Sequence, residues 1–178
     1  MQKLNAKELK EQYAEGKRDF GGIDLSEVNL FEADFREINL NGSNLTSTYL
    51  PYANLSQANL HAAQISAAEL SDVKLYQADL SEANLRGANL CRANLRYANL
   101  QGADLSGANL QGANLYNADL GSANLIDADL SRANLEGARL TQARLAGCNF
   151  YRARMVDFSD AYLDSTTVRP DGYREGSS

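Results

Sequence analysis

Residues 83–110 read ANLRGANLCRANLRYANLQGADLSGANL, in which one five-residue unit, Ala-(Asn/Asp)-Leu-x-x, recurs without interruption. The unit extends well beyond this stretch in both directions. From Phe20 to Met155, each of the 28 positions divisible by five is apolar, and 23 of them are Leu. The residue two places earlier is Ala at 20 of these positions, and the residue between is Asn or Asp at 21. A repeat this regular indicates a fold that stacks one small unit many times.

A period of five fits neither an α-helix nor a flat β-strand. On a helix, five residues turn the chain through about 500°, which would spread successive leucines around the cylinder. On a strand, an odd spacing sends alternate leucines to opposite faces. A chain that turns a corner after each unit avoids both problems, because Ala and Leu then point together into one narrow interior. We therefore expect Leu and Ala inside, and the other residues outside or at the corners.

This pattern resembles the pentapeptide-repeat family, whose consensus Ala-(Asp/Asn)-Leu-x-x matches the chain from about residue 18 to residue 155. The resemblance implies an all-β fold, a right-handed quadrilateral β-helix in which four pentapeptides make one coil. The 28 units would then give about seven coils, a rod of roughly 34 Å at the usual spacing of β-strands. We assign this solenoid to residues 19–155, and the chain looks most like the small bacterial members without an assigned role.

Residues 1–18 are predicted to form an N-terminal capping helix. Asn5 suits the N-cap position and Glu8 completes a capping box, while Leu4 and Leu9 can form a hydrophobic staple. Gly16 is placed to end the helix. Such a helix would cover the open end of the solenoid against edge-to-edge stacking.

The register of the repeat breaks near the C-terminus. Asp160 falls where a core residue is due, and Leu163 and Val168 resume the pattern three residues out of phase. We therefore predict a register break and a partial last coil over residues 156–168, with Leu163 and Val168 as core residues. Residues 169–178 are predicted to be a polar C-terminal tail.

Composition argues against several classes of function. The net charge is −6, with 17 Lys and Arg against 23 Asp and Glu, so a direct nucleic-acid binder is not expected. There is no apolar run of the roughly 18 residues that a membrane span needs, and no hydrophobic leader, so we expect a cytoplasmic protein without membrane contact. The 2 Cys residues are too few for a disulfide framework or a thiolate zinc site. We expect no metal and no cofactor.

The outward residues should form columns that repeat every 20 positions if four pentapeptides make a coil. One column then contains Tyr76, Arg96 and Tyr116 on successive coils, with Tyr97 in the next column. We predict that the Arg96 guanidinium lies between the rings of Tyr76 and Tyr116 in a cation–π arrangement. The four residues are a candidate interaction surface, since Tyr and Arg are enriched in binding hot spots. They could equally be a surface ladder that holds the coils in register.

Charge is uneven along the chain. Residues 19–80 contain nine acidic and two basic side chains, whereas residues 81–157 contain seven acidic and eight basic ones. Basic residues at the C-terminal end of the repeat could steer an acidic partner, or could prevent end-on polymerisation by repelling a like-charged end.

The sequence favours a non-catalytic function. His61 is the only histidine and is expected at an outward position without a catalytic partner, and a filled rod offers no pocket. We expect an interaction or scaffold protein that acts as a monomer on another protein. The alternative implied by the family resemblance is a DNA mimic that binds DNA gyrase, of the quinolone-resistance type. The chain departs from that type because its C-terminal half is slightly basic, no loops project from residues 20–155, and no C-terminal amphipathic helix is present to form a dimer.

Overall fold

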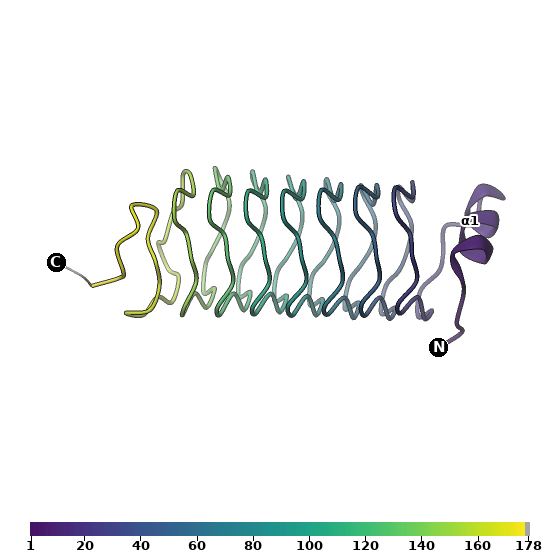
Figure 1. Ribbon diagram of the computed structural model, residues 1–178, viewed down its shortest axis with the longest axis horizontal. Helices are drawn as coiled ribbons and strands as arrows, with labels where there is room; N and C mark the ends of the chain where they lie inside the picture. The colour runs from purple at the N-terminus through teal and green to yellow at the C-terminus, as the bar shows by residue number, and fades with distance from the viewer. Residues whose placement is uncertain (177–178) are drawn as a thin grey trace.

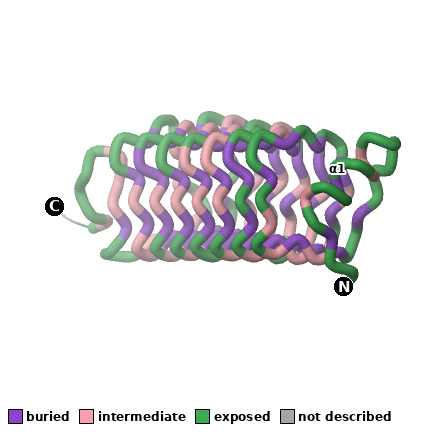
Figure 2. The backbone as a smooth tube through the Cα atoms, turned by 45° about the vertical axis from the view of Figure 1, so that its right-hand side comes forward, coloured by how far each residue is buried: buried purple, intermediate pink, exposed green. Residues whose placement is uncertain are grey.

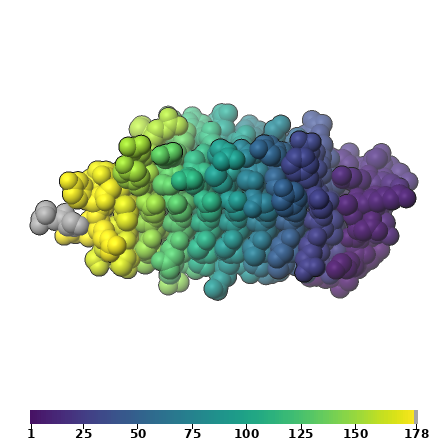
Figure 3. Space-filling model, viewed as in Figure 1, coloured from purple at the N-terminus to yellow at the C-terminus, as the bar shows by residue number. Residues whose placement is uncertain are grey.

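The computed structural model describes residues 1–176, which form a rod of stacked coils with one α-helix at its N-terminal end (Figure 1). Parallel β-bridges join equivalent residues of successive coils in an unbroken series from Asp19–Asn39 to Asn134–Arg154. This spacing means that four pentapeptides make one coil. Within the described residues these bridges are isolated, because each side of the coil is extended over too few residues to form a longer strand. In the space-filling view the N-terminal residues, in purple, and the last described residues, in yellow, lie at opposite ends of the rod (Figure 3).

Each corner is a β-turn that requires a left-handed backbone. The second residue after each core Leu position has a positive φ at every unit from Gly22 to Arg152. The turn is closed by a bond from the amide three residues after the core residue, as from Ala103 N to Leu100 O at 3.1 Å. A positive φ at the third turn residue is the mark of a type II turn, which favours Gly. Gly102 meets that need, whereas Tyr97 (φ 58°) accepts the same conformation with a full side chain.

Hydrogen bonds account for every backbone amide of a consensus pentapeptide. The amides at the Leu position and at the second corner residue donate to the next coil, and the amide at the Asn/Asp position donates to the preceding one. The first corner amide donates to the Asn/Asp side chain two residues earlier, and the last amide closes the turn. For residues 99–103 these bonds are Asn99 N to Ala78 O (3.0 Å), Leu100 N to Asp119 O (2.7 Å), Gln101 N to Asn99 Oδ1 (3.2 Å), Gly102 N to Gly121 O (2.9 Å) and Ala103 N to Leu100 O (3.1 Å).

The Asn/Asp side chains also bond to one another between coils. The Asn44 amide donates to Asp24 at 3.1 Å, and the Asn124 amide donates to Asp104 at 3.0 Å. The unit therefore prefers Asn or Asp because one short side chain serves both the corner amide and the neighbouring coil. No buried side-chain polar atom among the described residues lacks a hydrogen-bond partner.

The interior is a column of buried Leu and Ala side chains. Buried positions recur along the backbone of successive coils (Figure 2). The apolar positions from Phe20 to Phe150 are all at most 3% exposed. Three residues with a hydrogen-bond donor replace Ala inside the rod, and each donates to a backbone carbonyl of the preceding coil. These bonds are Ser43 Oγ to Phe20 O (3.0 Å), Thr48 Oγ1 to Leu25 O (2.9 Å) and Cys148 Sγ to Leu125 O (2.7 Å).

Helix α1 spans Ala6–Ala14 and lies at the N-terminal end of the rod. Asn5 and Glu8 form the reciprocal bonds of a capping box, both at 2.9 Å. Leu9 is fully buried, and the Tyr13 ring meets the ring of Phe35 edge-on at 5.1 Å. Residues 2–4 precede the helix and add a further rung, because Lys3 pairs in parallel with Asp24. Nothing in the five-residue pattern predicts this rung.

The end of the repeat differs from the sequence prediction at Met155 and Val168, and the predicted core residue Leu163 is only half-buried. The five-residue spacing predicts Met155 as a core residue, but its side chain is 69% exposed. The chain leaves the coil there because its return path is short: Tyr162 pairs with Arg144 and Val168 with Asn149, so both partners arrive before a full coil is complete. Val168 therefore occupies the outward bridge position rather than the predicted core position, and the fully buried residue beside it is Thr167.

The predicted polar tail is partly folded. Val168 pairs antiparallel with Arg174, and the Arg169 amide donates to Tyr173 O at 2.7 Å. Arg169 and Glu175 form an ion pair across this turn. The last two residues of the predicted tail, 177 and 178, lie outside the described part of the chain.

Replacement of Leu110 by Ala should destabilise the protein by about 2–5 kcal/mol, because Leu110 is fully buried in mid-rod and its loss leaves a cavity. Urea denaturation measures the change in free energy of unfolding. The matched control is Met155→Ala, in the same repeat position but exposed, which should change stability by less than about 0.5 kcal/mol. Equal effects of the two substitutions would contradict the assignment of the core.

Candidate functional site

Four residues at one corner of the rod form the tyrosine ladder: Tyr76, Arg96, Tyr97 and Tyr116. Their backbones are fixed by bonds between coils, from Gln77 N to Arg96 O at 3.0 Å and from Tyr97 N to Tyr116 O at 2.9 Å. Arg96 and Tyr97 are exposed, while Tyr76 and Tyr116 are half-buried. The structure therefore brings the four predicted residues together on a rigid corner.

The order of the side chains differs from the prediction. Tyr97, not Arg96, lies between the other two rings, with centroids 5.8 Å from Tyr76 and 5.6 Å from Tyr116, both edge-to-face. The Arg96 guanidinium lies 5.9 Å from the Tyr97 ring and 5.5 Å from the Tyr116 ring. Tyr97 takes the central place because three rings in edge contact bury apolar surface, whereas a guanidinium keeps its hydration by staying outside.

The ladder carries one uncompensated positive charge. Within residues 1–176, no carboxylate forms an ion pair with Arg96. A Tyr and Arg surface with this composition suits contact with another macromolecule, because its rings offer apolar area and its guanidinium offers directed donors.

His61 has a partner that the repeat pattern does not reveal. Its Nδ1 lies 2.9 Å from Ser81 Oγ, which occupies the same column on the next coil. Ser81 Oγ donates its proton to Asp79 Oδ1 at 2.7 Å, so the Ser81 oxygen accepts from the imidazole N–H. This direction is the reverse of the one that activates a nucleophile, where the histidine accepts the serine proton. The three residues form a surface hydrogen-bond chain.

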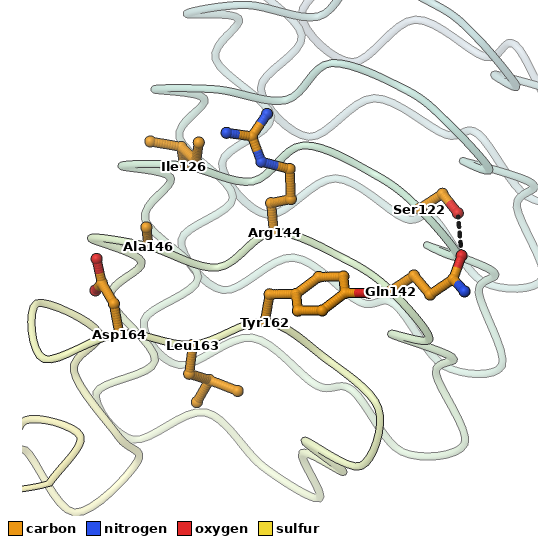
Figure 4. A pocket seen from close by; sticks show the side chains of 8 residues that line it. All are labelled: Ser122, Ile126, Gln142, Arg144, Ala146, Tyr162, Leu163 and Asp164. Carbon is orange, nitrogen blue, oxygen red and sulfur yellow. Dashed lines mark hydrogen bonds between the residues drawn. The ribbon is translucent and has the colours of Figure 1, made fainter.

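The short return of the chain at its C-terminal end leaves a surface hollow of about 510 Å³ (Figure 4). Its lining residues are Ser122, Ile126, Gln142, Arg144, Ala146, Tyr162, Leu163 and Asp164. Leu163, which the sequence predicts in the core, is half-buried and packs against the core from this edge. Hydrogen bonds from Thr166 lower the pKa of Asp164, which keeps that carboxylate charged. The hollow could not be predicted from the five-residue period, because it exists only where the period fails.

Neither a metal centre nor a membrane helix is found in the described chain. Residues 1–176 contain no group of three or more His, Cys, Asp or Glu side chains suited to hold an ion. Over the same residues, no helix has the length and apolar character needed to cross a bilayer.

The pentapeptide repeats family matches the chain with 8 copies, over residues 18–46, 38–77, 74–112 and 113–152. The chain belongs to the pentapeptide repeat family. This confirms the resemblance read from the Ala-(Asn/Asp)-Leu unit, and the fold of this pentapeptide repeat protein is a right-handed β-helix. No curated protein matches the sequence.

Several solved structures are similar to this pentapeptide repeat protein. HetL from the cyanobacterium Nostoc sp. strain PCC 7120, a pentapeptide repeat protein involved in heterocyst differentiation regulation, is 29% identical; the match covers 97% of this chain and 100% of HetL, with a TM-score of 0.44. QnrB1, a plasmid-mediated fluoroquinolone resistance protein, is 21% identical over 82% of this chain and 79% of its own, with a TM-score of 0.55. Rfr23 from the cyanobacterium Cyanothece 51142 is 26% identical over 92% and 99%, with a TM-score of 0.30. The similarity to QnrB1 supports the fold alone.

The two thiols of the pentapeptide repeat protein have different environments. Cys91 is half-buried at a corner, where its sulfur accepts a bond from Arg92 Nη1 at 3.3 Å. Cys148 is buried in an Ala position, and burial raises the pKa of its thiol to about 12. Since only the thiolate is reactive, Cys148 should be inert at neutral pH.

A thiol reagent should therefore modify one cysteine in the native protein and the second only after unfolding in urea. Absorbance of the released thiolate counts the reacted groups. The control is Cys91→Ser, which should leave the native protein unreactive. Equally fast reaction of both thiols in the native state would show that Cys148 is not held in the core.

Proposed function

We propose that this pentapeptide repeat protein is a non-catalytic interaction or scaffold protein that binds another protein through the tyrosine ladder. The observation that carries the proposal is the exposed Tyr97 ring, held between two further tyrosine rings and next to Arg96, which has no ion-pair partner within residues 1–176. Tyr and Arg clusters of this kind supply much of the energy at protein interfaces.

Rigidity supports this role. The corners that display the ladder are bonded to the coils on both sides, so binding need not order a loop and loses little conformational entropy. We infer that the rod, of about seven coils, works as a monomer and that α1 acts as its cap. The buried Leu9 covers the first coil, which would otherwise offer an open edge to a second molecule.

The alternative function is that of a DNA mimic that binds DNA gyrase. Its support is the acidic half of the chain, with nine acidic and two basic residues over residues 19–80. Residues 81–157, with eight basic and seven acidic side chains, separate this protein from a uniformly acidic mimic, and we place the interaction scaffold first for that reason.

Affinity capture followed by mass spectrometry tests the scaffold proposal. The wild-type protein should retain a specific partner, and Tyr97→Ala should weaken the purified complex about tenfold or more, as loss of a hot-spot tyrosine does. The matched control is Tyr151→Ala, a tyrosine 40% exposed at another corner, which should bind the partner as the wild type does. Partner binding that is the same for wild type and Tyr97→Ala would remove the ladder from the interface.

A DNA supercoiling assay tests the alternative. A gyrase-binding mimic should inhibit supercoiling, or protect gyrase from a quinolone, at micromolar protein. Absence of both effects would reject this function and leave the scaffold proposal unaffected.

A further inference from the structure

A second cluster of exposed aromatic side chains lies on the N-terminal half of the rod. Phe31, Tyr49 and Tyr52 are 42%, 44% and 53% exposed, so about half of each ring faces water. Phe31 stacks on Tyr49 with centroids 6.2 Å apart and meets Tyr52 edge-on at 5.9 Å. We call these three rings, with Glu32 and Glu69, the aromatic–acidic patch.

The patch interrupts the repeat at two linked positions. Tyr49 stands where the unit has Asn or Asp, so the side chain that normally accepts the first corner amide is missing. The corner residue that would need this acceptor is Pro51, which has no amide hydrogen. No amide at this corner is therefore left without a hydrogen-bond acceptor, although a tyrosine ring replaces the usual Asn or Asp side chain. A departure that gives up a stabilising side-chain bond in an otherwise regular repeat is the kind expected at a functional site.

Two carboxylates border the rings without a basic partner. Glu32 precedes Tyr52 by one coil in the same corner column, and Glu69 follows Tyr49 by one coil on the same face. Glu69 is held in place by the Asn89 amide, which donates to both of its oxygens at 2.8 and 2.9 Å. Within residues 1–176, neither Glu32 nor Glu69 forms an ion pair.

The other aromatic clusters of the described chain each hold one of the chain's own cations. Arg18 lies 3.9 Å from the ring of Tyr13, Arg96 lies 5.5 Å from Tyr116, and Arg169 lies 5.3 Å from Phe158. Among residues 1–176, the cluster of Phe31, Tyr49 and Tyr52 is the one with ring–ring contacts and no such cation. This cluster therefore lacks the cation that each of the other ring clusters has.

We propose that the aromatic–acidic patch binds an arginine side chain of an extended segment in a partner protein. Arginine fits better than lysine because its planar guanidinium can lie against a ring and donate paired hydrogen bonds to a carboxylate at the same time. The charges around the patch also favour a cation. Residues 19–80 contain nine acidic and only two basic side chains, Arg36 and Lys74, and Arg36 already pairs with Asp34 at 3.1 Å. This part of the rod therefore attracts positive charge. The patch lies in different columns from the tyrosine ladder, so this site is independent of the function proposed above.

The probe is a fluorescent peptide with a repeated arginine–serine sequence. The control is the same peptide with citrulline in place of arginine. Citrulline keeps the shape and most donors of arginine but has no charge. Fluorescence anisotropy at low ionic strength should show binding of the arginine peptide and at least about tenfold weaker binding of the citrulline peptide. Equal binding of the two peptides, or no binding of either, would overturn the proposal.

Variants locate the site on the rod. Tyr52→Ala and Glu32→Gln should each weaken binding about two- to fivefold, as expected for one exposed cation–π contact or one exposed ion pair. Tyr151→Ala and Glu82→Gln are the controls: Tyr151 is a tyrosine 40% exposed near the C-terminal end of the repeat, and Glu82 has the same turn position as Glu32, with a φ of 58°, on another corner. These controls should bind the peptide as the wild type does.

Two results would contradict the assignment of the patch. A loss of affinity in Glu82→Gln as large as in Glu32→Gln would mean that only the overall negative charge attracts the peptide. Sedimentation of the wild type as a dimer at low ionic strength, reversed by Tyr52→Ala, would identify a second copy of this chain as the occupant in place of a partner protein.

Discussion

The hydrogen bonds that join each coil to the next set every other property of this protein. From Phe20 to Leu135, the amide of each core residue donates to the carbonyl of an Asn/Asp position in the next coil, as from Leu110 to Asp129 at 2.7 Å, so the backbone must return to the same place after every coil. The pentapeptides of this chain meet that condition by turning four corners in each coil, as the 20-residue spacing of the bridges shows. The positive φ at each corner follows from this requirement, and the side chains must adapt to it.

This constraint separates stability from recognition. The inward positions are almost uniform, since any change of volume would be felt by the coils above and below. The outward positions carry no such restriction, and a side chain placed at one of them meets only its neighbours in the same and adjacent columns. Function can therefore be changed by substitution at the corners without a change in the core. Tyr97 and Tyr52 show this freedom, because both take the same turn position and yet belong to different surfaces.

The period allowed the buried Leu and Ala positions to be predicted from the sequence, and the family resemblance supplied the number of pentapeptides in a coil. The sequence predictions were wrong for features that depend on the direction of side chains at the corners or on the exact length of one coil. The left-handed backbone of Tyr97 brings its ring toward the adjacent column, which a list of columns does not reveal. Met155 keeps the regular spacing but is exposed, because the chain that follows it returns before a full coil is complete. The cluster of Phe31, Tyr49 and Tyr52 was missed because its members belong to three columns, so no single column contains an aromatic run.

Pairing within the chain indicates which attractions at the surface are already satisfied. Where a ring cluster of this protein has its own guanidinium, as Arg96 beside Tyr116, the attraction between cation and ring is already used inside the molecule. Where a carboxylate has its own base, as Asp72 has Arg92 at 2.6 Å, its charge is likewise neutralised, and hydrogen bonding to Asp72 raises the pKa of Arg92. Asp72 follows Tyr52 by one coil in the same column, so this neutralised pair adjoins the aromatic–acidic patch, in which rings and carboxylates have no cation. Within residues 1–176, no cation lies over these rings and none forms an ion pair with Glu32 or Glu69, so that attraction remains for a partner to satisfy.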